Sequence, residues 1–244
     1  MTKDQEPMPS PSVPLADIAY ERIREMVLRR QIRPGEQTSV AKLASQTKLG
    51  RSPVKEAITR LVSEGLLQVS DRRGTTAVKL TRSDIADLFE LRQIFEKYVA
   101  SRAAKNITSA ELQELSELLV ILEEESLSKP PEKQSIAKFI DADVRLHEII
   151  IRSAGNAHLT RHYKLLNLHL QISDYLFRHH TGMREERHRD HIAMVDALRE
   201  RDGERLATLL EQHSNSVKHV ILTAMEVEEA DGSTWLNHST PADH

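Results

Sequence analysis

Cysteine is absent from this chain of 244 residues. Its absence excludes disulfides, thiol catalysis and cysteine-ligated metal ions, and it fits a reducing compartment. The chain also lacks an apolar run of about 18 residues, the length that a membrane-spanning helix needs, and its first residues contain no apolar signal core. We therefore expect a cytoplasmic protein with no membrane partner.

Aromatic residues are scarce too, at 4% of the chain, whereas Leu, Ile, Ala, Glu and Arg are abundant. The abundant residues favour helices over a sheet-rich fold. A chain of 244 residues suits one large domain or two ordinary ones, with enough apolar residues for a core. The composition therefore predicts a mainly α fold.

Charge is distributed unevenly along the chain. Residues 1–82 contain 15 Lys and Arg against 9 Asp and Glu, a net charge of +6, whereas the rest contains 19 against 28, a net charge of −9. All twelve histidines lie beyond residue 146. This asymmetry predicts two domains with different partners, the first of which binds a polyanion, although a drift of surface charge along the chain is the simpler alternative.

The two ends of the chain have the composition of segments without a packed core. Residues 1–14 are polar and contain four prolines, so we expect a disordered arm there. Residues 226–244 are acidic and polar, and we expect a flexible tail. The first predicted helix contains Ile18, Ile23 and Val27 and continues to Ile32, where the Arg33-Pro34-Gly35 turn ends it.

Two short helices joined by a tight turn are predicted next, at 40–47 and 51–64. Ser39 is placed to cap the first helix, and Ser52 to cap the second, with Pro53 at the first helical position. Arg51 and Lys55 lie one turn apart at the start of the second helix and are expected to be exposed. This is the plan of a helix-turn-helix whose second helix enters the DNA major groove.

Two predicted strands, at 66–70 and 75–80, bracket the basic tip from Asp71 to Gly74 and form a wing. Its side chains Arg72 and Arg73 could reach phosphates or the minor groove while the preceding helix reads base edges. Each basic residue taken alone is an ordinary solvated side chain. The ordered series of helix, turn, helix and wing predicts DNA binding.

Residues 15–80 resemble the winged helix-turn-helix of the GntR family of bacterial transcription regulators. The resembling stretches are Pro34-Gly35, Leu43-Ala44, RSPVKEAITRLVSEGLL from Arg51 to Leu67, and Arg73-Gly74. By this resemblance the DNA contacts would be Arg51, Ser52, Lys55, Arg72, Arg73 and Gly74. Three positions, Ala41, Gly50 and Lys55, depart from the family's pattern. Lys55 replaces an arginine and cannot reproduce its bidentate geometry, so the resemblance does not imply which operator sequence the chain reads.

The remainder of the chain predicts an all-α antiparallel bundle over 83–225. Ser83, Ser135 and the Thr108–Glu111 capping box are placed to begin three of its helices. The six predicted helices span 83–103, 108–127, 135–154, 157–179, 184–201 and 204–225, with a break at Asp202-Gly203 before the last.

Asp143 and His147 interrupt the apolar stripe of the third bundle helix. They are four residues apart, so they lie on the same helix face and point into the core. His191 and His213 likewise lie on the apolar faces of two later helices. One carboxylate and three imidazoles from three helices are a donor set that a divalent first-row metal accepts. A structural metal ion, or a hydrogen-bond network without metal, remains the alternative.

The other histidines give weaker signals. His162 and His169 either line a cavity or lie on the surface. The remaining ones are expected to be exposed to solvent: His158, His179, His180, His188, His219, His238 and His244.

The bundle is similar to the all-helical FCD effector domain of the FadR subfamily. The similar stretches are ELRQIFEKYVASRAA from Glu90 and DVRLHEIIIRSAGNAHL from Asp143, with Asp190-His191 and Gln212-His213. The resemblance implies a divalent metal ion, zinc first with nickel or manganese as alternatives, bound by Asp143, His147, His191 and His213. It also implies a small organic acid effector on the metal, with Arg92 nearby.

These observations predict a homodimeric transcription regulator that binds a palindromic operator on double-stranded DNA and responds to a carboxylate effector. The rival hypothesis is a hydrolase in which a metal held by the Asp and the three His activates water. It requires a general base, and the inferred helix faces offer no further carboxylate.

Overall fold

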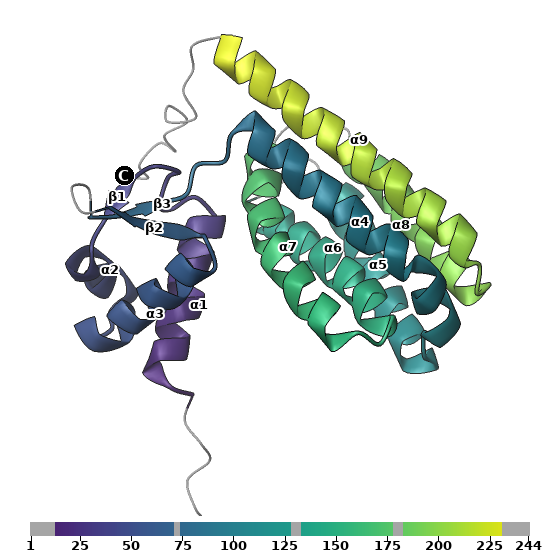
Figure 1. Cartoon of the computed structure of the whole chain (residues 1–244), viewed down its shortest axis with the longest axis horizontal. Coiled ribbons are helices and arrows are strands. Elements are labelled where there is room, and N and C mark those ends of the chain that lie inside the picture. The colour runs from purple at the N-terminus through teal and green to yellow at the C-terminus, as the bar shows by residue number, and fades with distance from the viewer. Residues whose placement is uncertain (1–12, 71–73, 128–132, 178–182, 231–244) are drawn as a thin grey trace, which may run out of the picture. The chain divides into compact units, whose positions relative to one another are not determined.

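The computed structural model describes residues 13–70, 74–127, 133–177 and 183–230, and Figure 1 shows its helices and strands. The chain divides into two compact units, Met1–Lys79 and Leu80–His244. Helices predominate in both, as the composition predicts. In the described residues, no helix is long and apolar enough to span a membrane.

The first unit is a three-helix winged fold. Its helices are α1 (Leu15–Leu28), α2 (Val40–Thr47) and α3 (Arg51–Ser63), and its strands are β1 (Gln37–Thr38), β2 (Leu67–Ser70) and β3 (Gly74–Ala77). The strands form an antiparallel sheet in the order β1-β3-β2, with Gln68 and Gln37 both opposite Thr76. The buried side chains of Ile23, Leu43 and Leu61 join the three helices into one core.

Two local predictions in the first unit are wrong, and one strand was not predicted. Helix α1 ends at Leu28, before Ile32, because Arg30 adopts a left-handed conformation with φ of 56°. Gly50 occupies the N-cap of α3, so Ser52 lies inside the helix and gives it no cap. The two-residue strand β1 is too short to leave a periodic pattern in the sequence.

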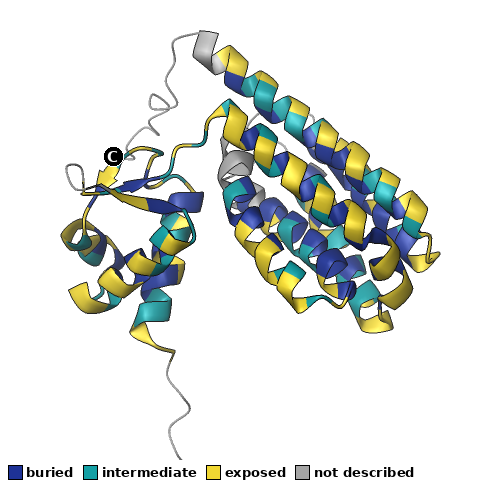
Figure 2. Ribbon diagram, viewed as in Figure 1, coloured by how far each residue is buried: buried dark blue, intermediate teal, exposed yellow. Residues whose placement is uncertain are grey.

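The second unit is a bundle of six described helices. They are α4 (Arg82–Asn106), α5 (Ser109–Leu127), α6 (Lys133–Ser153), α7 (Ala157–Phe177), α8 (Met183–Arg199) and α9 (Gly203–Ala230). Figure 2 shows their buried faces turned toward one another and their exposed faces turned outward. Helix α4 packs against α6, α7, α8 and α9, so four other helices of the bundle cover its inner side.

Several helix ends in this unit differ from the sequence predictions. Thr81, rather than Ser83, caps α4 through a capping box with Asp84. Helix α6 begins at Lys133, two residues before the predicted cap Ser135. Helix α9 continues to Ala230, so the first five residues of the predicted tail are helical; 231–244 lie outside the described residues, as do 1–12 of the predicted arm.

Candidate metal and effector site

Four buried side chains from three helices meet inside the second unit. Asp143 and His147 come from α6, His191 from α8 and His213 from α9, and each is no more than 2% exposed. Their candidate ligand atoms all lie within 4.8 Å of one another. The structure therefore brings together all four residues that the sequence singled out.

The donor set fits a divalent metal ion chemically. Two ligand atoms that each lie about 2.1 Å from one ion can be at most about 4.2 Å apart, so the four donor atoms lie close to the separations that one ion requires. His213 Nε2 is buried and has no hydrogen-bond partner among the described residues. A buried nitrogen of this kind is costly unless a ligand engages it. One carboxylate and three imidazoles would leave a charge of about +1 on the complex.

Burial keeps two of the imidazoles neutral. It lowers the pKa of His191 to about 4, and it lowers the pKa of His213 well below its ordinary value. A neutral imidazole retains the lone pair that a metal ion requires. Asp190 Oδ2 lies 3.1 Å from His213 Nδ1, which places the proton on Nδ1 and leaves Nε2 for the shared centre.

Glu96 performs the same role for His147. One of its oxygens, Oε1, lies 3.0 Å from His147 Nδ1 and accepts hydrogen bonds from Arg92 Nε at 2.9 Å and from the Tyr163 hydroxyl at 2.6 Å. Burial by itself opposes the ionised carboxylate, but the neighbouring Arg92 and His147 lower the pKa of Glu96 to about 2. The carboxylate therefore stays ionised beside the ring. Arg92 Nη2, 2.8 Å from His147 Nε2, can only donate, which places the imidazole proton on Nδ1.

Arg92 lies at the edge of the cluster, where the resemblance places an effector contact. Its Nη2 is 2.8 Å from His147 Nε2, and its Nε is bound to Glu96. A second buried guanidinium approaches from α8, because Arg187 Nη2 donates to Asp143 Oδ1 at 3.3 Å. Two arginines beside one set of donors make the surroundings favourable for an anion.

Sequence reasoning singled out Arg92 but missed three other residues around the four donors, namely Glu96, Arg187 and Tyr163. Glu96 is the further carboxylate whose absence the sequence analysis assumed, and that assumption was wrong. Glu96 could have been predicted, because it lies four residues after Arg92 and therefore on the same inward face of α4. Arg187 lies four residues before His191 and carried the same signal. Tyr163 carried none, because its contact with Glu96 joins helices 67 residues apart in the chain.

The other described histidines are not among the four clustered donors. His188 is 8% exposed, so its predicted exposure was wrong, and burial lowers its pKa. His158, His162 and His219 are exposed, and His162 Nδ1 contacts the carbonyl oxygen of His158. The predictions for His179, His180, His238 and His244 concern positions outside the described residues.

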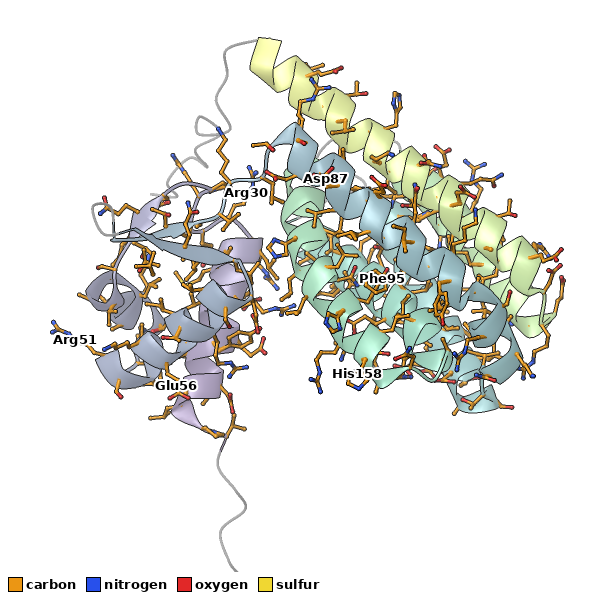
Figure 3. The ribbon with its side chains drawn as sticks, viewed as in Figure 1. Arg30, Arg51, Glu56, Asp87, Phe95 and His158 are labelled. Atoms are coloured by element: carbon orange, nitrogen blue, oxygen red, sulfur yellow. The ribbon has the colours of Figure 1, made fainter. Side chains whose placement is uncertain are left out.

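The candidate DNA contacts of the first unit lie on α3 and the wing. Arg51, Ser52 and Lys55 are all exposed, and the Arg51 side chain projects outward from the start of α3 (Figure 3). Gly74 begins β3 with φ of 69°, a conformation that favours glycine at the wing. Arg72 and Arg73 lie outside the described residues.

Known families match both units. Residues 15–76 match the bacterial regulatory proteins of the gntR family, and residues 87–216 match the FCD domain. The chain belongs to the GntR-type transcription regulators that carry an FCD domain. FCD domains often bind metal ions, and the buried cluster lies inside the matched region.

Individual relatives are similar along most of their length. The chain is 24% identical to the HTH-type transcriptional repressor RspR of Escherichia coli K12, over 93% of this chain and 96% of that protein. It is 29% identical to the HTH-type transcriptional repressor NanR of Enterobacter sp. strain 638, over 83% and 84%. The solved structure of E. coli McbR/YncC has the same fold, with a TM-score of 0.76, 19% identity and coverage of 88% and 100%.

Proposed function

We propose that this protein controls transcription through a small carboxylate effector that binds at a divalent metal ion in the second unit and changes operator affinity. The observation that carries the proposal is the buried Asp143, His147, His191 and His213 cluster, inside a chain whose first unit is a winged helix-turn-helix. Zinc is the first candidate metal, with nickel or manganese as alternatives. The protein binds DNA and is not an enzyme in this proposal.

The residues around the cluster have separate tasks. Glu96 and Asp190 orient the rings of His147 and His213, so that each ring presents Nε2 to the ion. The ion, when bound, supplies open coordination positions for one oxygen of the effector. Arg92, which Glu96 holds beside His147, would pair with a second carboxylate oxygen of the effector.

The DNA-binding unit acts as one half of a symmetric pair. A homodimer presents two α3 helices to a palindromic operator, with half-sites about one helical turn apart. On α3, Arg51, Ser52 and Lys55 contact the major groove, and Arg72, Arg73 and Gly74 of the wing contact the backbone or minor groove. Effector binding changes operator affinity by about 1 to 3 kcal/mol through linkage between the two units.

A thermal-shift screen of metabolic carboxylates, with and without a chelator, tests the effector site. A carboxylate that raises the melting temperature only in metal-loaded protein supports the proposal. The His213→Ala variant should lose this response, whereas His219→Ala, an exposed histidine on the same helix, should keep it. Wild-type protein without stoichiometric metal would remove the metal from the proposal and leave a hydrogen-bond network.

Fluorescence anisotropy with operator-library DNA tests the other half of the proposal. Binding should be sequence-selective, should weaken steeply with salt and should change when the effector is added. Binding that ignores both sequence and salt would contradict a regulator.

The hydrolase alternative gains a candidate base in Glu96, which lies beside His147. A carboxylate whose pKa is lowered to about 2 is a weak base, however, because general bases work best with a pKa near the working pH. Turnover of small esters by metal-loaded protein, lost in His147→Ala, would favour the hydrolase. We expect no turnover.

A further inference from the structure

Helix α4 carries a line of large apolar side chains on its outer face. Leu91, Ile94 and Tyr98 follow one another at spacings of three and four residues and are 47%, 59% and 60% exposed. Single exposed apolar residues are ordinary on protein surfaces. Three in one line on one helix form a patch, and such patches mark interaction sites. The opposite face of α4 is covered by the bundle, so this face is the one left for a partner.

Charged residues flank the apolar line, with opposite signs at its two ends. Asp87 lies one turn before Leu91, and Arg102 lies one turn after Tyr98. Figure 3 shows Asp87 near the beginning of the helix. Both side chains are exposed, and within the described part of the chain neither forms an ion pair. Lys97 differs, because it points sideways to Glu211 of α9 at 3.7 Å.

We propose that this face of α4 binds the same face of a second copy of the chain, with the two α4 helices antiparallel across a two-fold axis. The axis passes between Ile94 and Phe95, the midpoint both of Leu91 and Tyr98 and of Asp87 and Arg102. Leu91 then faces Tyr98 of the partner subunit, and Asp87 faces Arg102 of the partner subunit. A parallel arrangement would place each Asp87 beside the partner's Asp87, which repulsion disfavours.

The charge pattern selects a second copy over an unrelated partner. A two-fold interface requires one surface to complement itself, with each residue repeated in the reversed direction. An acidic end, an apolar centre and a basic end on one helix satisfy that requirement. A stable interface buries about 800 Å² on each copy, more than one helix face supplies, so the neighbouring α7 and α9 must complete it.

This inference rests on the proposed function only for the expectation of a homodimer. If a different face joins the two copies, the regulator remains and the α4 interface is wrong. Loss of DNA binding in a variant that remains dimeric would instead concern the DNA contacts. The two failures are therefore distinguishable.

Sedimentation velocity of the full chain tests the interface through charge reversal. Asp87→Arg and Arg102→Asp should each raise the dimer dissociation constant by about tenfold, because like charges then face each other. The double variant should restore dissociation to near the wild-type value, an outcome that a general loss of folding cannot produce. Ile94→Asp, at the centre, should raise the constant by about thirtyfold or more. Val120→Asp, equally exposed on α5, is the matched control and should have no effect.

Cross-linking gives a second test, because the chain contains no cysteine of its own. Ile94→Cys lies beside the axis and should form a disulfide-linked dimer, since a disulfide requires Cα atoms within about 7 Å. Asp87→Cys alone should not link, whereas Asp87→Cys combined with Arg102→Cys should. Three results would each overturn the proposal. The wild-type chain could be monomeric, Val120→Cys could cross-link as well as Ile94→Cys, or Ile94→Asp could have the dimer dissociation constant of the wild type.

Discussion

The two units differ in where they keep their polar and charged side chains. In the described residues of the first unit the buried polar side chains are three threonines, Thr38, Thr47 and Thr76. One of its ion pairs, Arg60–Asp17, lies at the surface, with the two side chains 43% and 49% exposed. The second unit buries Arg92, Glu96 and Arg187 together with its four candidate metal ligands.

This difference shows how the tasks of the units relate to stability. A helix that contacts DNA from outside can change its exposed side chains with little effect on folding. A site inside a bundle cannot, because removing one member of a buried charged set leaves the others unpaired. Substitutions at the two candidate sites should therefore have opposite signatures in stability and binding.

The largest contrast should come from breaking one ion pair in each unit. Glu96→Ala leaves Arg92 buried without its carboxylate, and we expect the free energy of unfolding of the second unit to fall by about 3 to 5 kcal/mol. Asp17→Ala breaks the surface pair of the first unit and should cost less than about 1 kcal/mol. Hydrogen exchange measured peptide by peptide reports on each unit. Equal losses in both units would contradict the contrast.

Metal removal should affect one unit alone. A metal ion present at about 100 times its dissociation constant stabilises the protein that binds it by about 2.7 kcal/mol. A chelator should therefore lower the unfolding free energy of the second unit by about that amount and leave the first unchanged. Calorimetry of the full chain measures this difference. Chelation should have no effect on His213→Ala, and a chelator effect on the first unit would place metal elsewhere.

Substitutions of two glycines at helix starts, one in each unit, should have opposite effects on stability. A Cβ added at Gly203 of α9 would lie 2.6 Å from Ser101 Cα of α4, so Gly203→Ala should destabilise the second unit by about 1 to 3 kcal/mol. At Gly50 the nearest neighbour is the Pro53 ring at 3.6 Å, and serine is a good N-cap, so Gly50→Ser should stabilise the first unit by about a few tenths of a kcal/mol. Urea denaturation measures both. No loss in Gly203→Ala would show that α9 can move away from α4.

The smallest stability effects should accompany a clear loss of DNA binding. Arg51→Ala and Lys55→Ala should each change the unfolding free energy by less than about 0.5 kcal/mol. For a residue that contacts a phosphate, the slope of log affinity against log salt should fall by about 0.9. Anisotropy titrations at several salt concentrations measure the slope. Glu56→Gln, exposed on the same helix, is the control and should not reduce it.

The sequence predicted the fold class well because helical periodicity and turn residues are local signals. Gly155 ends α6 with φ of 73°, and Asn156 caps α7 through Leu159, as a Gly-Asn pair after an apolar stripe indicates. The Ser39 cap of α2 was predicted correctly for the same reason. The predicted start of α4 was wrong because two good N-cap residues, Thr81 and Ser83, lie close together. Asp84 distinguishes them, since it stands three residues after Thr81 and completes a capping box with it.

The candidate site was predicted only as far as single helices allow. A charged or imidazole side chain within the apolar stripe of a helix is predicted to point inward. This reasoning identified Asp143, His147, His191 and His213. The spacing of residues within one helix does not predict which inward side chains of different helices contact each other. The partners of Glu96 could therefore not be predicted from the sequence. Its contacts with Tyr163 and His147 depend on how α4, α6 and α7 pack, and that packing is a tertiary property.

The connection between the units has very few degrees of freedom. Val78 N–H still donates to the Leu66 carbonyl oxygen, and the capping box fixes the backbone at Thr81, so Lys79 and Leu80 alone are unrestrained by either unit's backbone hydrogen bonds. Helix α4 has 25 residues and is about 37 Å long, so a change of about 10° in its direction would move its far end by about 6 Å. In the proposed homodimer, a small rotation at these two residues would therefore alter the spacing of the two α3 helices.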